Sequence, residues 1–338
     1  MRFLLLLFLA AAAAQWQTQN SGTDASLRGI SAVSANVAWA SGSNGTVLRT
    51  LDGGEHWQKL TVEGAEQLDF RDIQAFSEST AFALSIGPGE QSRIYKTTDA
   101  GQHWTLQFTN HNPKAFYDCF AFWDEKHGIA VSDSVNGAFP LIITTDGQTW
   151  NALHPRIMPA ALANEGAFAA SGTCIATAGM HMVWFATGGP AARVFHSTNR
   201  GHSWRVVNSP LLSGAGPQGI FSIAFHDIRN GAIAGGDYEK AKNSQQNFAF
   251  THDGGEHWIT PKIPPSGYRS AVVFPGQSKD VLIAVGTTGS DYSTDGGNTW
   301  HPLDTANYNA ASFAADGASW AVGPNGRIAK FAGLPAGN

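Results

Sequence analysis

The sequence predicts an all-β fold, a seven-bladed β-propeller, and a repeated motif carries most of that prediction. Six times the chain places a Thr or Ser, an Asp or Asn and a glycine ahead of a tryptophan, after a stretch rich in β-branched and aromatic residues. The interval of 42 to 54 residues is typical of one four-stranded blade and is marked by Trp57, Trp104, Trp150, Trp204, Trp258 and Trp300.

Each motif is predicted to form the tip of a β-hairpin. Its Asp or Asn can accept hydrogen bonds from turn N–H groups, its glycine allows a positive φ, and its tryptophan packs the outer strand on its neighbour. The pattern resembles the Asp-box, or BNR repeat. One carboxylate per turn is a poor calcium site, so we expect structural roles for the tryptophans and for Asp52, Asp99, Asp146, Asn199, Asp253 and Asp295.

Six motifs mark six blades, and the two ends of the chain supply a seventh. After the last motif, strands are predicted near residues 311–314, 318–323 and 327–331, with no outer strand behind them. Residues 15–19 resemble the outer strand that each motif precedes, so their pairing with the last strand would close the ring and remove an exposed edge. The predicted blades span 26–62, 68–110, 115–155, 165–208, 218–263, 267–304, and 308–332 joined by 15–20.

The first fourteen residues predict export. A basic start, a short apolar run and a string of alanines are typical of a signal peptide, here residues 1–14, cleaved before Gln15. A retained N-terminal anchor is the alternative. We expect 15–338 to be a single propeller domain, periplasmic or extracellular and a monomer, with no membrane insertion after cleavage. Cys119 and Cys174 fall in neighbouring blades, where a disulfide and two buried thiols both remain open.

Composition and motif searches exclude several classes of function. A net charge of −5 with 14% charged residues gives no basic excess for a nucleic acid partner. Motifs for zinc hydrolysis, serine hydrolysis and dinucleotide binding are missing, and the histidines form no ligand pattern. We therefore expect no metal and no cofactor.

Three arginines form the first candidate binding site. Arg28, Arg71 and Arg269 occupy comparable blade positions, and closure of the ring would make their blades near neighbours at one mouth of the central channel. Such a cluster favours a carboxylate or another anion. Local pairing of each arginine with an acid or with backbone carbonyls is the alternative.

Blades three to five supply acids and two insertions. The insertions cover 154–173 and 237–246, and extra loop length in repeat proteins gathers on the functional face. The candidate residues there are Asp118, Asp133, Glu165, Asp237, Tyr238 and Lys242. We expect the largely apolar surroundings of Glu165 to raise its pKa, although a plain loop acid is the alternative.

The whole chain from residue 15 resembles the photosystem II stability and assembly factor family, Ycf48/HCF136. The resemblance rests on the export signal, inner strands such as 27–30 and 70–73, the turns at 42–47 and 323–328, and the tryptophan motifs. It implies a non-enzymatic assembly factor that binds a partner protein through an arginine patch, here Arg28, Arg71 and Arg269.

We therefore expect an exported binding or assembly module that captures a protein segment or anionic ligand at its channel mouth. The other large Asp-box group, the sialidases, suggests the alternative: a glycoside hydrolase or lyase acting on an acidic saccharide. Its candidate catalytic residues would be Glu165, Asp133 and Tyr238, with the two carboxyl groups roughly 5–10 Å apart on one mouth.

Overall fold

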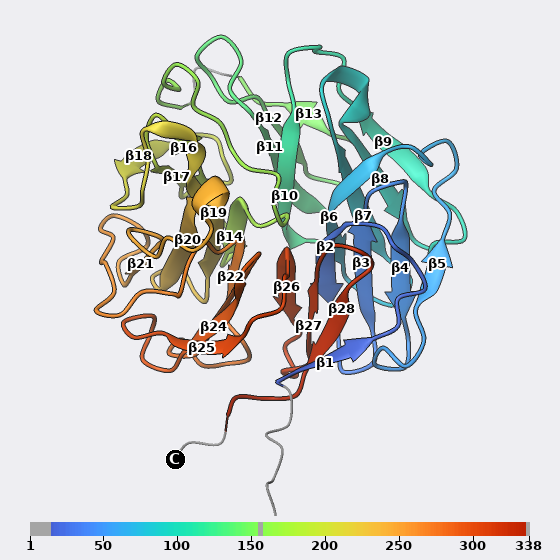
Figure 1. Cartoon of the computed structure of the whole chain (residues 1–338). Helices are drawn as coiled ribbons and strands as arrows, with labels where there is room; N and C mark the ends of the chain where they lie inside the picture. The colour runs from blue at the N-terminus through green and yellow to red at the C-terminus, as the bar shows by residue number, and fades with distance from the viewer. Residues whose placement is uncertain (1–14, 155–157, 336–338) are drawn as a thin grey trace, which may run out of the picture.

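The chain forms seven four-stranded antiparallel sheets arranged as the blades of a propeller. In the computed structural model, which describes residues 15–154 and 158–335, the sheets follow one another around a ring in chain order (Figure 1). No α-helix occurs in these residues, and none of their helical turns is long and apolar enough to cross a membrane. The predicted signal peptide lies outside the described residues.

The first three blades each run outward from the central channel in chain order. Blade one comprises β2 (Leu27–Ala32), β3 (Ala38–Gly42), β4 (Val47–Thr50) and β5 (Gln58–Leu60). Blade two comprises β6 (Asp69–Ala75), β7 (Ala81–Ile86), β8 (Arg93–Thr97) and β9 (Thr105–Thr109), with a 3-10 turn η1 (Gly89–Gln91) before β8. Blade three comprises β10 (Tyr117–Asp124), β11 (His127–Ser132), β12 (Leu141–Thr144) and β13 (Asn151–Ala152).

The remaining blades follow the same plan with local additions. Blade four comprises β14 (Ile175–Ala178), β15 (Met182–Ala186), β17 (Arg193–Ser197) and β18 (Arg205–Asn208). Blade five comprises β19 (Ala215–Phe225), β20 (Gly231–Asp237) and β21 (Phe248–Thr251), with β16 (Gly188–Gly189) on its inner edge and the 3-10 turn η3 (Tyr238–Lys240) after β20. Blade six comprises β22 (Ala271–Val273), β23 (Leu282–Gly286), β24 (Gly289–Ser293) and β25 (His301–Asp304).

Blade seven joins the two ends of the chain, as predicted. It contains β26 (Ala310–Phe313), β27 (Ser319–Val322), β28 (Ile328–Phe331) and β1 (Trp16–Gln19), and β1 pairs with β28 from Trp16–Phe331 to Gln19–Ile328 (Figure 1). Trp16 is buried, and its indole N–H donates to Ser290 Oγ of blade six at 3.1 Å. The predicted seven-bladed closure is confirmed, because the N-terminal strand completes the last blade.

The side chains of the Asp-box turns bond to their own turns. Asp99 Oδ1 accepts the backbone N–H of His103 and the hydroxyl of Thr97, both at 2.9 Å. These bonds, the backbone one first, lower the pKa of Asp99 to about 2. Asn199 Oδ1 accepts the corresponding bonds from Ser203 and Ser197, also at 2.9 Å. An amide therefore holds this turn as a carboxylate does.

Blade five lacks a full outer strand, which the repeat did not predict. One residue pair links β21 to the following segment, with Phe250 N–H to Ile259 O at 3.0 Å and the reciprocal bond at 2.8 Å. Continued pairing would place Pro261 opposite Phe248, and proline has no N–H to donate. The chain instead crosses to blade six, where Lys262 N–H donates to Asn298 O at 2.8 Å.

A disulfide joins blades three and four. Cys119 of β10 and Cys174, directly before β14, are bonded with their Cα atoms 6.1 Å apart, and both are fully buried. They lie in an apolar cluster with Ile129, Val131 and Phe185. Of the two possibilities that the sequence left open, the structure therefore shows the disulfide.

Candidate binding site at the channel mouth

One mouth of the channel is built from equivalent positions on the innermost strands. Arg28, Arg71, Asp118 and Phe221 each lie at a shift of pairing register between the first two strands of their blades. A register shift of this kind is a β-bulge, which redirects a side chain away from the regular alternation. Ser270 and Asn309, which precede β22 and β26, line the same cavity as Arg28 and Arg71.

The blade-four insertion fills part of this mouth with residues 166–172, which we call the plug. Arg28 Nη1 donates to Ala170 O and Arg71 Nη1 donates to Ala169 O, both at 3.1 Å. On the other side, Asp133 Oδ1 accepts the N–H of Ala167 at 2.9 Å. Charged side chains from three blades thus bind the plug backbone.

The plug is also fastened further down the channel. Ser171 Oγ donates to Ser270 O at 2.8 Å and lies 2.6 Å from Thr173 Oγ1, which in turn donates to Ser222 Oγ at 2.7 Å. The disulfided Cys174 follows directly. The plug therefore separates the mouth from the central channel cavity of about 370 Å³, which is lined by the innermost strands.

Above the plug lies a cavity of about 390 Å³, which we call the mouth pocket. Its lining residues come from blades one, two, five, six and seven and from the plug: Arg28, Arg71, Phe168, Ala169, Ala170, Phe221, Tyr238, Tyr268, Ser270, Thr287 and Asn309. Its volume falls at the lower end of the range for ligand sites. It has room for the end or tip of a partner segment.

The two arginines of the mouth pocket differ in their charge partners. Arg71 Nε donates to Asp69 Oδ2 at 2.8 Å, and both side chains are about one-third exposed. Arg28 forms no ion pair with any carboxylate of the described residues, and burial together with the neighbouring Arg71 lowers its pKa. The remaining guanidinium nitrogens of Arg28 and Arg71 are not among the buried side-chain atoms that lack a hydrogen-bond partner in the described chain. The pocket thus has an excess of positive charge with N–H groups left to donate.

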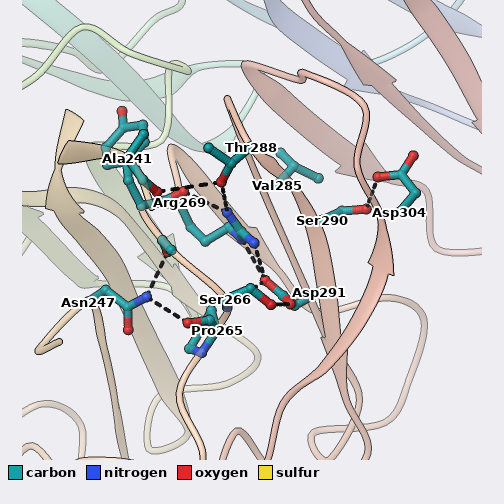
Figure 2. A network of polar contacts seen from close by, with 12 residues as sticks. Ala241, Asn247, Pro265, Ser266, Arg269, Val285, Thr288, Ser290, Asp291 and Asp304 are labelled. Atoms are coloured by element: carbon teal, nitrogen blue, oxygen red, sulfur yellow. Dashed lines mark hydrogen bonds and ion pairs between the residues drawn. The ribbon is translucent and has the colours of Figure 1, made fainter. Parts of the chain in front are cut away.

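Arg269 does not belong to this site, contrary to the sequence prediction. Its side chain is 1% exposed and forms an ion pair with Asp291, whose side chain is equally buried (Figure 2). Its Nε lies 2.7 Å from Asp291 Oδ2, and its Nη1 donates to Tyr268 O at 2.8 Å and to Thr288 Oγ1 at 3.1 Å. The alternative of local pairing, left open by the sequence, holds for this arginine.

A one-residue difference between blades explains the error. The N–H of Arg269 donates to Gly235 O of the preceding blade, as Leu27 N–H does to Gly323 O and Tyr308 N–H does to Gly286 O. Arg269 therefore takes the place of the buried Leu27 and Tyr308, and Ser270 takes the place of Arg28. Because side chains alternate along a strand, a shift by one residue exchanges an inward position for a mouth position.

Glu165 is also buried, and its predicted role as an accessible acid is wrong. Its side chain is fully buried against Arg193, whose Nε donates to Glu165 Oε1 at 2.7 Å. Thr187 Oγ1 donates to the same oxygen at 2.6 Å, and Leu162 N–H donates to Oε2 at 2.8 Å. The predicted apolar surroundings are absent because Arg193 reaches this carboxylate from β17. Glu165 holds the insertion to blade four and offers no free oxygen to a substrate.

Neither Asp118 nor Asp133 lines the mouth pocket: Asp118 is buried, and the half-buried Asp133 lines a separate cavity together with Glu165. Burial raises the pKa of Asp118 well above its ordinary value, and the nearby Asp133 raises it further. Burial also raises the pKa of Asp133 to about 6. One oxygen of Asp118 has no hydrogen-bond partner within the described residues. Asp72, on β6, is buried as well and accepts the N–H of Phe120 at 2.9 Å.

Of the candidate residues in the blade-five insertion, Asp237 is buried, whereas Tyr238 and Lys242 are exposed. Asp237 is buried and caps η3 by accepting the N–H groups of Glu239 and Lys240 at 3.0 and 3.2 Å. Tyr238, which follows it, is 48% exposed and lines the mouth pocket. Lys242 is exposed and does not line that pocket.

Sequence reasoning missed most of the apolar lining. Phe168, Phe221 and Tyr268 line the mouth pocket beside the arginines, but a single aromatic residue at a strand start is indistinguishable from a core residue in the sequence. The bulge positions offered a usable signal, because Phe221 occupies in blade five the place that Arg28 and Arg71 occupy in blades one and two.

The fold and the site define a class: a seven-bladed Asp-box propeller whose channel mouth forms a basic pocket. The model of the family described as photosynthesis system II assembly factor YCF48 matches residues 9–332 of this chain. The chain therefore belongs to the YCF48 family.

The individual relatives share less than a quarter of their residues with this chain. The photosystem II assembly lipoprotein Ycf48 of Synechococcus sp. (strain CC9902) is 24% identical over 226 residues, which cover 67% of this chain and 59% of that protein. A structure described as YCF48 bound to D1 peptide superimposes with a TM-score of 0.67 at 14% identity, covering 95% of this chain and 98% of the other. YCF48 from Cyanidioschyzon merolae gives a TM-score of 0.66 at 18% identity, covering 94% and 99%. At these identities the structures establish a shared fold.

Proposed function

We propose that this chain is an exported binding or assembly module that captures a segment of a partner protein in the mouth pocket, with Arg28 and Arg71 holding an anionic group of that segment. The single observation that carries the proposal is the uncompensated charge of Arg28 beside Arg71 in a partly buried cavity. A carboxylate forms charge-assisted bonds to such groups that are about twice as strong as those of a neutral acceptor.

Two further observations support a protein partner. The family to which the chain belongs is named for an assembly factor, and one YCF48 of the same fold has been seen with a peptide from D1. The pocket of about 390 Å³ also fits a short piece of polypeptide. The glycosidase alternative gains nothing from the site, because the carboxylate of Glu165 is consumed by Arg193.

The test measures binding of short acetylated peptides that carry one Asp or Glu, or a free C-terminal carboxylate, against otherwise identical peptides with the amide. We expect the carboxylate peptides to bind more tightly, and the double variant Arg28→Gln/Arg71→Gln to lose at least a hundredfold in affinity. That figure follows from two bonds to a charged group at about 1.5–3 kcal/mol each.

A matched control is available on the outer rim. Arg205 lies on β18 with 79% of its side chain exposed, so Arg205→Gln removes the same charge away from the mouth. Thermal unfolding of each variant verifies that the fold is kept. Equal binding of acid and amide peptides, or an Arg205→Gln variant as impaired as the double variant, would remove the proposal.

Export and a monomeric state are part of the same proposal. The basic and apolar start of the chain supports cleavage before Gln15. Mass spectrometry of the protein isolated from its host should give a mature chain that begins at Gln15, and light scattering should give the mass of one copy. A retained Met1 would contradict cleavage, and a dimer mass would contradict the monomer.

A further inference from the structure

One wall of the mouth pocket is aromatic, and its residues come from the plug and from blades five and six. Phe168 of the plug stacks on Phe221 of β19 with ring centres 3.8 Å apart and planes 14° apart. Tyr268 meets Phe221 edge-on at 4.8 Å, and Tyr238 does so at 5.9 Å. We call Phe168, Phe221, Tyr238 and Tyr268 the aromatic wall.

The aromatic wall and the basic side of the pocket adjoin each other. Arg28 and Tyr268 both line the pocket, and they are close enough for the charge of Arg28 to act against the effect of burial on the pKa of Tyr268. Burial raises the pKa of Tyr268 far above neutral pH, so its phenol stays protonated and can act as a donor. Within the described residues no hydrogen bond is formed by this hydroxyl, and it is not among the buried, unpaired atoms.

We propose that the mouth pocket selects a partner segment in which a carboxylate stands next to an aromatic side chain. Arg28 and Arg71 would hold the carboxylate, and the aromatic side chain would lie on the aromatic wall against the exposed ring of Tyr238. This inference rests on the proposed function and adds to it the identity of the neighbouring residue.

The shape of the site supports an adjacent pair of groups over a long extended segment. The plug forms part of the pocket lining, and the carbonyl oxygens of Ala169 and Ala170 accept hydrogen bonds from the two guanidiniums. A partner chain therefore cannot thread past the arginines into the channel. The carboxylate of the partner and its neighbouring side chain would both occupy this cavity of about 390 Å³, whose lining contains the two arginines and the aromatic wall.

Aromatic pairs favour stacked or edge-on contacts, and the exposed half of Tyr238 is available for one. An Ala in place of the aromatic residue would leave this wall facing water. A Lys or Arg there would meet the positive charge of Arg28 and Arg71. The pocket therefore favours an aromatic neighbour over a small or a basic one.

The test compares acetylated, amidated hexapeptides with the central pair Phe-Asp or Asp-Phe against Ala-Asp and Asp-Ala, on the full-length mature protein. We expect the aromatic peptides to bind at least tenfold more tightly to the unmodified chain. Tyr238→Ala should reduce this ratio to below threefold, and Tyr238→Phe should retain it. Leu106, which is 47% exposed on β9, gives a control of equal exposure outside the pocket as Leu106→Ala.

The outcomes separate this inference from the proposed function. If Phe-Asp and Ala-Asp peptides bind equally and Arg28→Gln/Arg71→Gln abolishes both, the basic site stands and the aromatic selection is wrong. If aromatic peptides bind regardless of the two arginines, both ideas fail. An unchanged preference in Tyr238→Ala would also overturn the selection, because the proposed contact is with the ring that this variant removes.

Discussion

Arg269→Met should destabilise the protein strongly, whereas the same change at a rim arginine should not. The guanidinium of Arg269 makes hydrogen bonds to Asp291, Tyr268 O and Thr288 Oγ1, and both members of the ion pair are 1% exposed (Figure 2). Removing one partner of a buried pair leaves the other charge without compensation, which costs about 3–5 kcal/mol. Methionine keeps much of the side-chain volume, so little of the loss would arise from a cavity.

A double variant tests whether the uncompensated charge of Asp291 causes the loss of stability. Asp291 also accepts from Ser266, with its N–H at 3.1 Å and its hydroxyl at 2.5 Å. Arg269→Met/Asp291→Asn keeps an oxygen for Ser266 but leaves no buried charge, so it should recover most of the lost stability. The measurement is urea unfolding, followed by tryptophan fluorescence and far-ultraviolet circular dichroism, with Arg205→Met as the control.

The result that refutes this reasoning is specific. An Arg269→Met variant within about 1 kcal/mol of the unmodified chain would mean that the ion pair contributes little. A double variant no more stable than the single one would show that uncompensated charge is not the cause. In either case the assignment of Arg269 to structure and not to partner binding would lose its energetic basis.

Three further predictions concern stability. His196 is 4% exposed and neither ring nitrogen forms a hydrogen bond, although Nε2 lies 3.7 Å from Glu256 Oε1. Burial lowers its pKa more than Glu256 raises it, so the unfolded state binds more protons below about pH 6.5 and stability should fall as pH drops. His196→Phe should flatten this slope in urea unfolding between about pH 7.5 and 5. Burial raises the pKa of Asp133 to about 6, so stability should fall as pH rises from the ordinary Asp value of about 3.9 to about 6 and stay level above it. Asp133→Asn, which keeps an acceptor for Ala167, should therefore be more stable than the unmodified chain at about pH 7.5 and equal to it near pH 4, and a constant difference would contradict this. Cys119→Ala/Cys174→Ala opens a loop of 55 residues and should cost about 4 kcal/mol, so an unchanged unfolding midpoint would exclude a stabilising disulfide.

The sequence was sufficient for the architecture because its strongest signals are local. Each Asp-box turn forms its hydrogen bonds within a few consecutive residues, as between Asp99 and His103, so the motif specifies its hairpin without help from distant residues. The pairing of residues 15–19 with the last strand could be predicted by counting strands, because an incomplete last blade needs an outer strand; the register, with Trp16 opposite Phe331, came from the structure. Pro261 is a local signal that the prediction overlooked, because a residue without an N–H cannot continue the outer strand of blade five.

The site could not be predicted to the same level because it depends on register and on distant partners. Arg28 and Arg269 each stand near the start of a predicted innermost strand, but a one-residue offset places one at the mouth and the other in a buried ion pair. Glu165 is neutralised by Arg193, which lies 28 residues further along the chain, and no pattern in the sequence joins them. Such errors are expected wherever a side chain's environment is set by contacts between blades.

The two sides of the mouth pocket have different origins in the chain. Arg28 and Arg71 stand at a position that recurs in the repeat, so their charge is placed by the blade itself. Phe168 and Tyr238 come from insertions in blades four and five, outside the strands that repeat in every blade. A change in either insertion can therefore alter which neighbouring side chain the pocket accepts, while the arginines retain the carboxylate. Affinity for an acid and choice among acidic segments are thus separable in this propeller, and the peptide pairs that differ only beside the carboxylate measure the second without the first.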